Sequence, residues 1–353
     1  MKILQVCPKY YPAIGGIEEH VRNISERLAH EHEVTVFTCD PTGKLSREQE
    51  INGVLVKRFK SFTPGDAYYI SFQMTMELEK SRFDIVHGHS YHALPLYFAR
   101  NVKTKKFVVT PHYHGHGHTL TRNFLIKLYK PFGKNIYEKA DKVIAVSRYE
   151  KRLLLHDFAI DEKKISVIPN GVNLSEFSKL ETISGKQKII LYIGRLEEYK
   201  GVQHLINTLP LLSDAFHLEI VGKGPYKNHL MAQVDELGLR SRVSFYQDLS
   251  RQELLERYVK AGIFVLLSQH EAFSIVIAEA LASKTPCIVA NTSALTEWID
   301  NINCFGINCP VDGYELAELI TRVIGTQVGD VKLWDWDEVV QELLKFCDLD
   351  TDL

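Results

Sequence analysis

Short apolar segments alternate with amphipathic stretches along almost the whole chain, and this alternation constrains the fold more than any other feature of the sequence. In the first half, buried strands are expected over residues 2–7, 33–38, 84–87, 106–110 and 142–146. Apolar residues recur at helical spacing between Ile17 and Leu28, which predicts an amphipathic helix over residues 17–30. Strands that alternate with helices in this way are typical of βαβ units and parallel sheets.

A second series of such units begins at residue 188. Strands are expected over residues 188–193, 217–221, 242–246, 262–267 and 285–289, and helices over 201–212, 226–237, 251–260 and 275–282. The polar stretch 178–188, which follows Pro169-Asn170-Gly171-Val172, is interpreted as a linker. We therefore predict an α/β protein with two doubly wound domains, residues 1–175 and 176–333. A last amphipathic stretch, residues 334–346, has no strand after it and is free to pack on either domain.

The composition fits a globular protein of this size. The 353 residues match two domains of roughly 150 residues each, and the 45% apolar and 24% charged residues exclude a disordered or collagen-like chain. No apolar run approaches the ~20 residues of a membrane span, and Pro8 interrupts the start before a signal-peptide core could form. A cytoplasmic location is therefore expected. The six cysteines form no C-x-x-C pair and are interpreted as buried thiols.

Charge is distributed unevenly between the two halves. Residues 1–175 carry 26 Lys and Arg against 18 Asp and Glu, whereas residues 176–353 carry 16 against 26. Between Asp84 and Glu138 there are eight basic residues and no acidic one. Such a positive segment favours an anionic partner: phosphates, an acidic glycan or an anionic membrane surface. No nucleic-acid partner is expected.

Two basic residues follow the strand expected at 188–193. Arg195 and Lys200 lie in the segment Gly194–Gly201, between this strand and the next helix. Two cations together with the N–H groups of a helix N-terminus form a site for an anion. The alternative is a solvated loop with two surface charges, but the position at the carboxyl end of a strand favours the anion site.

Two carboxylates, Glu271 and Glu279, stand eight residues apart around an apolar segment. Retaining glycosidases need two carboxyl groups ~5.5 Å apart and inverting ones need less than ~10 Å. Eight helical residues span about 12 Å, so this pair does not suit a glycosidase. We interpret the two glutamates as holding different parts of one extended ligand.

In the first half, a glycine pair and a histidine follow expected strands. Gly15 and Gly16 allow close approach of the backbone to a ligand, although their spacing is not the G-x-G-x-x-G of dinucleotide folds. Alternating histidines between His112 and His118 suggest a metal site, but the surrounding basic segment offers no carboxylate or cysteine to complete it. We expect one working histidine, His112, and no metal.

Taken in order along the chain, these segments resemble the GT-B retaining glycosyltransferases of family 4, the group 1 glycosyltransferases. The matching stretches are residues 12–18, 110–112, 146–147, 167–172, 192–196, 200–201 and 221–225, and the E-x7-E element from Glu271 to Glu279. The resemblance implies two Rossmann-like domains that face each other across a cleft. It also implies that the final helix, within residues 334–353, packs back on the first domain.

The resemblance implies a role for each matching residue. Arg195 and Lys200 would hold the donor diphosphate, and Glu279 would bind the ribose hydroxyls. Glu271 and the backbone of residues 273–275 would hold the transferred sugar, which His112 would contact from the first domain. The residues expected to be catalytic are His112, Arg195, Lys200 and Glu271. Those expected to bind substrate are Gly15, Gly16, Ser147, Asn170, Gly194, Phe273, Ser274, Ile275 and Glu279.

The expected activity is metal-independent, retaining transfer of a hexose from a UDP- or GDP-sugar to a hydroxyl acceptor, such as a lipid-linked acceptor or a glycan. No Asp-x-Asp element follows a strand to hold a metal, so no cofactor is expected. A sugar-nucleotide epimerase on the same fold and a non-catalytic nucleotide-sugar binding protein are the alternatives. An oxidoreductase is disfavoured because no G-x-G-x-x-G follows the first strand.

The chain departs from the family pattern at four places. Ser274 and Ser293-Ala294 stand where the family has glycine, residues 246–248 lack the expected glycine, and Asn173 stands where the family has Asp. A further segment, residues 122–134, mixes basic and apolar residues at helical spacing. It suggests docking on an anionic membrane face, and a solvated helix packed on its own domain is the alternative.

Overall fold

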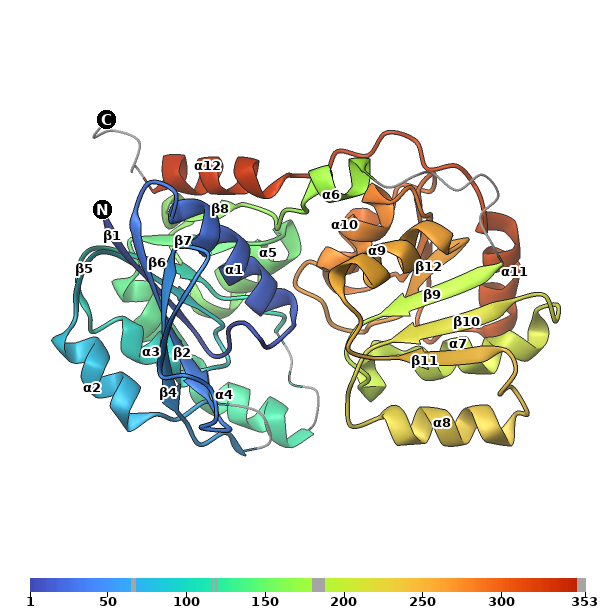
Figure 1. The fold of residues 1–353 in the computed structure, drawn as a ribbon, viewed down its shortest axis with the longest axis horizontal. Coiled ribbons are helices and arrows are strands. Elements are labelled where there is room, and N and C mark those ends of the chain that lie inside the picture. Colours follow the sequence, from blue (N-terminus) through green and yellow to red (C-terminus); the bar gives the residue numbers. More distant parts are fainter. Residues whose placement is uncertain (65–67, 116, 118–119, 180–187, 348–353) are drawn as a thin grey trace. The chain divides into compact units, whose positions relative to one another are not determined.

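The computed structural model describes residues 1–64, 68–115, 117, 120–179 and 188–347, except for the side chains of residues 120–128. The chain divides into two compact units (Figure 1). The N-terminal unit comprises Met1–Gly171 and Trp336–Leu353, and the C-terminal unit comprises Val172–Asp335. The division thus falls four residues before the boundary that we expected at residues 175 and 176.

The N-terminal unit contains an eight-stranded sheet in the order β3-β4-β2-β1-β5-β6-β7-β8. Its strands are β1 (Lys2–Cys7), β2 (Glu33–Asp40), β3 (Glu48–Ile51), β4 (Val54–Lys60), β5 (Arg82–His89), β6 (Lys103–Thr110), β7 (Lys142–Ala145) and β8 (Ile165–Val167). Only β3 runs antiparallel to its neighbour. The β3–β4 hairpin, which we did not predict, turns at Asn52 and Gly53, both with positive φ, as a two-residue hairpin requires.

Helices connect these strands, and one further helix, α12, is the last element of the chain. They are α1 (Gly16–Leu28), α2 (Phe72–Lys80), α3 (Leu94–Ala99), α4 (Leu120–Lys139), α5 (Arg148–Phe158), the 3-10 turn η2 (Glu162–Lys164) and α12 (Trp336–Phe346). Helix α12 packs against α1, where the Trp336 side chain is buried. Arg27 of α1 also pairs with Asp337 of α12, with 2.5 Å between Nε and Oδ1.

The C-terminal unit contains a six-stranded parallel sheet in the order β11-β10-β9-β12-β13-β14. Its strands are β9 (Ile189–Ile193), β10 (His217–Val221), β11 (Val243–Tyr246), β12 (Ile263–Leu266), β13 (Cys287–Ala290) and β14 (Cys304–Ile307). Numbered within the unit, this is the order 3-2-1-4-5-6 of Rossmann folds, which reverses between β9 and β12. The predicted α/β class with doubly wound sheets is confirmed.

The helices of the C-terminal unit are α6 (Leu174–Ser178), α7 (Val202–Thr208), α8 (Lys227–Glu236), α9 (Arg251–Lys260), α10 (Ile275–Ala282) and α11 (Gly313–Val323), with 3-10 turns η3 (Glu198–Lys200), η4 (Leu209–Leu211) and η5 (Ser293–Trp298). The helix predicted over 201–212 is shorter than expected. It ends at Thr208 and continues as η4 because Pro210 has no N–H to donate to an α-helical bond.

Each sheet has an order reversal, and this determines where ligands can bind. In the C-terminal unit it lies between β9 and β12, and in the N-terminal unit between β1 and β5. In open α/β sheets, ligands bind outside the carboxyl ends of the strands at such a point. The segments that follow these four strands are therefore the places where a ligand is expected to bind.

Candidate active site

An ion pair lies at the order reversal of the C-terminal sheet. Lys200 ends η3, in the connection after β9, and Glu271 follows β12. The Lys200 Nζ lies 2.6 Å from Glu271 Oε1, and the two side chains are 14% and 16% exposed. Burial would lower the pKa of Lys200, but the charge of Glu271 outweighs this effect and raises it. Lys200 therefore carries its charge at neutral pH.

Arg195, the second predicted cation, is held less firmly. Its Nη2 lies 2.6 Å from Glu197 Oε1, and its side chain is 58% exposed. Exposed ion pairs contribute about 0–1 kcal/mol, so an incoming anion can replace Glu197 at small cost. A Cβ at the preceding residue, Gly194, would lie 2.8 Å from the Tyr192 hydroxyl. The loop before Arg195 therefore has no room for a side chain at this position.

Glu279 lies on α10 and is buried. Arg251 Nη1 donates to its Oε1 over 2.5 Å, and the Tyr258 hydroxyl donates to its Oε2 over 2.9 Å. Arg251 also bonds Glu176, with 2.8 Å between Nε and Oε2. Arg251, Tyr258 and Glu176 were not predicted from the sequence. No local pattern marks them, because contacts between different elements bring them together. Glu279 and Glu271 thus have different cationic partners.

The segment between the two glutamates is held by η5. Trp298 Nε1 donates to the carbonyl oxygen of Phe273 over 2.9 Å, and the two rings lie 5.1 Å apart edge to face. The Ser293 hydroxyl accepts the N–H of Glu271 over 3.1 Å. Ser274 precedes α10, which begins at Ile275. These contacts fix the backbone that was predicted to hold the transferred sugar.

Three residues in segments that depart from the family pattern have positive φ angles. Ser274 has a φ of 89°, Ser293 a φ of 50° and Asp248 a φ of 57°. This left-handed region is where glycine is least strained. The chain therefore keeps a backbone that suits glycine while it carries a side chain at each of these positions.

In the N-terminal unit, three histidines meet beside the order reversal. His112 follows β6, His20 lies on α1 after β1, and His89 ends β5. The ring centroid of His20 lies 4.8 Å from that of His112 and 5.3 Å from that of His89. The sequence analysis missed His20 and His89. The signal for His20 was its position three residues after Ile17, on the apolar face of the predicted helix.

Burial keeps these imidazoles neutral at neutral pH. It lowers the pKa of His20 to about 4, although a bond from His20 Nδ1 to Asn170 Oδ1, 2.7 Å long, opposes the effect. It also lowers the pKa of His89 and of His112 well below the usual value. Asn170, predicted to bind substrate, thus bonds to His20.

The glycine pair and Ser147 have distinct surroundings. A Cβ at Gly15 would collide with the Glu18 carboxylate, whereas a Cβ at Gly16 would meet no atom within 4 Å. The Ser147 hydroxyl accepts the N–H of Glu150 over 3.0 Å and caps α5. Its predicted substrate contact would have to compete with this cap.

Glu150, which the sequence analysis did not single out, joins two loops of the N-terminal unit. Its buried carboxyl group accepts the N–H of Val146 over 2.7 Å and also the N–H of Tyr113. Tyr113 follows His112 directly, so Glu150 fixes the backbone next to that histidine. Of the other alternating histidines, the ring of His114 stacks on His92, whereas His116 and His118 lie outside the described residues.

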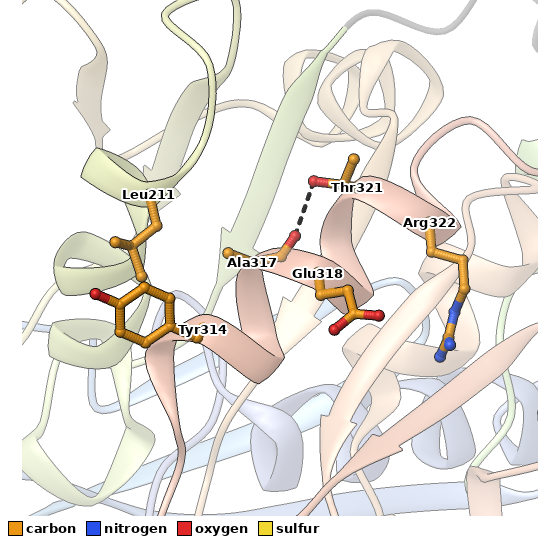
Figure 2. Close-up of a pocket in the computed structure, with 6 residues that line it drawn as sticks. All are labelled: Leu211, Tyr314, Ala317, Glu318, Thr321 and Arg322. Carbon is orange, nitrogen blue, oxygen red and sulfur yellow. Dashed lines mark hydrogen bonds between the residues drawn. The ribbon is translucent and has the colours of Figure 1, made fainter.

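A surface hollow of about 500 Å³ lies elsewhere in the C-terminal unit, between η4 and α11 (Figure 2). Its lining residues are Leu211, Tyr314, Ala317, Glu318, Thr321 and Arg322. None of them is a candidate site residue. The Thr321 hydroxyl donates to the carbonyl oxygen of Ala317 over 2.8 Å, which is a bond within α11. The hollow therefore offers no chemistry to the site described above.

The segment proposed to dock on a membrane, residues 122–134, belongs to α4. The side chains of Arg122 and Lys127 lie outside the described residues. Lys130 Nζ lies 2.9 Å from Asp157 Oδ1, and Lys134 Nζ lies 3.9 Å from Glu138 Oε1. Among the described residues, no helix has both the length and the apolar character that crossing a membrane requires.

Comparison with known proteins identifies the family. Residues 14–176 match the model of Glycosyltransferase Family 4, and residues 175–327 match that of Glycosyl transferases group 1. An uncharacterized glycosyltransferase of Methanocaldococcus jannaschii is 28% identical over 97% of this chain and 96% of its own length. The GDP-mannose:cellobiosyl-diphosphopolyprenol alpha-mannosyltransferase of Xanthomonas oryzae is 29% identical over 80% of this chain and 77% of its own.

A solved structure agrees with the fold. The crystal structure of an Anabaena protein in complex with UDP and glucose superposes with a TM-score of 0.77 at 18% identity. The match covers 99% of this chain and 100% of the Anabaena chain. Two Rossmann-like units and consecutive matches to both family models identify this chain as a GT-B glycosyltransferase that belongs to the group 1 glycosyltransferases of family 4.

Proposed function

We propose that this glycosyltransferase moves a hexose from a UDP- or GDP-sugar to a hydroxyl group, with retention of configuration and without a metal ion. The observation that carries the proposal is the Lys200–Glu271 pair at the order reversal of the C-terminal sheet. A cation beside a carboxylate suits a ligand that carries both a diphosphate and a sugar. The cation attracts the diphosphate, and the carboxylate accepts hydrogen bonds from sugar hydroxyls.

Lys200 and Arg195 would stabilise the leaving group. When the bond between sugar and diphosphate breaks, negative charge develops on the diphosphate, and positive charge that is already in place lowers the barrier. Glu271 fixes the ammonium of Lys200 before any ligand arrives. By analogy with lost oxyanion donors, removal of either cation should reduce kcat by about 100-fold or more.

Glu279 would bind the ribose of the nucleotide. Arg251 and Tyr258 already donate to its two oxygens. The same donors hold the carboxylate in a fixed orientation, so a ribose hydroxyl meets an acceptor that needs no reorganisation. The contact of His112 with the transferred sugar is carried over from the family and remains a prediction.

The donor and acceptor classes rest on the relatives. One relative's name pairs GDP-mannose with a diphosphopolyprenol-linked acceptor, and the Anabaena structure holds UDP and glucose. Both nucleotides therefore remain within the proposal, and the acceptor would be a hydroxyl of a lipid-linked sugar or another glycan.

A lipid-linked acceptor would bring the enzyme to a membrane surface, and residues 122–134 are our proposed contact. Lys130 and Lys134 already have acidic partners, so part of their charge is neutralised. We expect co-sedimentation with vesicles of phosphatidylglycerol to weaken on charge reversal by Lys127→Glu and Lys130→Glu. Co-sedimentation that these changes leave unaltered would remove the membrane contact from the proposal.

A ligand and product screen tests the proposed activity. Thermal shifts and product formation are measured with UDP-, GDP- and ADP-sugars, each with and without a chelator. One nucleotide should stabilise the protein in the presence of chelator, and NMR of the product should show the donor's anomeric configuration. Strict dependence on an added divalent metal, an inverted product or epimerised sugar released without an acceptor would contradict the proposal.

Two variants separate nucleotide binding from transfer. Arg195→Ala should weaken nucleotide binding, whereas Glu271→Ala should keep nucleotide binding but stop transfer. Arg240→Ala is the matched control, because Arg240 belongs to the same unit and pairs with Asp235 at an exposed position. If Glu271→Ala leaves transfer unchanged, Glu271 does not hold the transferred sugar.

A further inference from the structure

In the N-terminal unit, two buried imidazoles, those of His20 and His89, are each held in one orientation by a hydrogen bond to a side-chain amide. His20 Nδ1 donates to Asn170 Oδ1 over 2.7 Å, and His89 Nε2 donates to Gln5 Oε1 over 2.7 Å. A neutral imidazole carries one N–H, so the other nitrogen of each ring, His20 Nε2 and His89 Nδ1, carries a lone pair.

Among the described residues, no donor forms a hydrogen bond to these lone pairs. His20 Nε2, His89 Nδ1 and His112 Nε2 are buried and have no hydrogen-bond partner there. One ring nitrogen of each histidine lies within 4.8 Å of those of the other two. A buried polar atom without a partner costs about 1–3 kcal/mol, so this arrangement is unfavourable unless something occupies the space between the rings.

We propose that His20, His89 and His112 bind one divalent transition-metal ion of the zinc class. Three neutral imidazoles are a frequent ligand set for zinc. A ligating histidine almost always donates its second nitrogen to a fixed acceptor, which is the part that Asn170 and Gln5 take here.

To bind one metal ion, the ring nitrogens of the three histidines must move closer together. Tetrahedral zinc with bonds of about 2.0–2.1 Å holds its ligand atoms about 3.3 Å apart, whereas these nitrogens lie within 4.8 Å of one another. His20 and His89 belong to a helix and a strand, and His112 lies on the loop after β6. The loop residue therefore supplies the movement, and the fourth position is left for water or an anion.

A metal at this site would inhibit transfer, and this part of the inference rests on the proposed function. His112 is the residue expected to contact the donor sugar, and its lone pair cannot serve both the ion and a sugar hydroxyl. The ion is thus a competitor for His112 and gives no assistance to the leaving group.

Metal binding is measured directly on the full chain. Protein stripped by a chelator is titrated with Zn²⁺ in competition with a chromophoric chelator, and with Co²⁺, whose visible absorption reports tetrahedral coordination. Every sample carries Cys309→Ser, because Cys309 is the exposed thiol among the described residues. We expect one tight Zn²⁺ per chain. No tight Zn²⁺ in this background would overturn the inference.

Ligand variants identify the site. His20→Gln, His89→Gln and His112→Gln should each weaken Zn²⁺ binding at least about 100-fold, since loss of an outer partner alone costs about 10–100-fold. His30→Gln is the control, because His30 is exposed on the same unit. One tight Zn²⁺ in all three ligand variants, or its loss in His30→Gln, would overturn the assignment.

Measurements of folding and of transferase activity distinguish a failure of the zinc site from misfolding of a variant and from a failure of the proposed function. Circular dichroism and Tm of the metal-free variants establish that they fold. If a ligand variant fails to fold, Asn170→Ala tests the site through the outer partner, with about 10–100-fold weaker Zn²⁺ binding expected. Tight Zn²⁺ binding in a chain without transferase activity would contradict only the proposed function, whereas active enzyme without a Zn²⁺ site would contradict only this inference.

Discussion

The Lys200–Glu271 pair can be tested by a double-mutant cycle with Lys200→Met, Glu271→Gln and the combination of the two. Both side chains are largely buried, at 14% and 16% exposure. Removal of one partner of such a pair leaves an uncompensated charge and should destabilise the C-terminal unit by about 2–4 kcal/mol, somewhat less than for a fully buried pair. Removal of both should cost only about 1 kcal/mol, because the net contribution of a buried pair is small.

Calorimetry of the four proteins measures the cycle. Since 1 kcal/mol corresponds to about 2–4 °C for a unit of this size, each single variant should lower Tm of the C-terminal transition by roughly 4–16 °C, and the double variant by only about 2–4 °C. The two single effects should therefore exceed the double effect by several kcal/mol. If they add to within about 0.5 kcal/mol, the pair is not coupled and the reasoning is wrong.

The same variants separate the roles of the pair in binding. Glu271→Gln removes the charge that neutralises Lys200, so affinity for UDP or GDP should be kept or raised although transfer is lost. Lys200→Met should lose affinity for the nucleotide. Isothermal titration with UDP and GDP measures both effects. A nucleotide affinity that falls equally in both variants would contradict the separate roles assigned to cation and carboxylate.

Three further predictions concern stability and are measured by thermal or urea denaturation. Ser274→Gly removes a side chain at a φ of 89° and should stabilise the C-terminal unit by about 0.5–1 kcal/mol net of the entropy of glycine, whereas Ser274→Ala should not. Burial lowers the pKa of His20 from 6.5 to about 4. The free energy of unfolding should therefore be highest above pH 6.5 and fall as the pH drops through 4, with His20 contributing up to about 3 kcal/mol. A loss of stability in acid that is the same in His20→Gln would contradict this. Burial raises the pKa of Glu150 from 4.5 to about 8, so its contribution should be full below pH 4.5 and be lost as the pH rises through 8, and Glu150→Gln should flatten this alkaline loss.

The fold could be predicted in large part because many of its strands contain a short apolar run. Segments such as Lys2–Cys7 and His217–Val221 are buried on both faces, and a parallel sheet between two helical layers requires this. The β3–β4 hairpin was not predicted, because Glu48–Ile51 is mostly exposed and polar and therefore has no apolar pattern. Its Asn52-Gly53 turn was the one local signal available.

Most of the candidate site residues were chosen from the sequence because they follow an expected strand, and Glu279 was chosen from the spacing of two carboxylates. Lys200 and Glu271 were chosen in the first way, because they lie in the segments that follow β9 and β12. Their direct contact depends on β9 lying next to β12, and strand order is a property of the whole sheet. Arg251 escaped for a related reason: it contacts Glu279 over 28 positions of sequence, and on its own helix it has the pattern of an ordinary exposed arginine.

The net charge of each half of the chain does not point to the candidate anion site. Residues 1–175 carry the excess of basic residues, yet the order reversal of the N-terminal sheet holds neutral imidazoles. Residues 176–353 are acidic overall, yet the two candidate diphosphate ligands, Arg195 and Lys200, lie there. Charges beyond a Debye length of about 8–10 Å are largely screened at physiological salt. In the proposed function, short-range contacts with these two side chains would therefore recognise the diphosphate, and acidic residues farther away would weaken this recognition little.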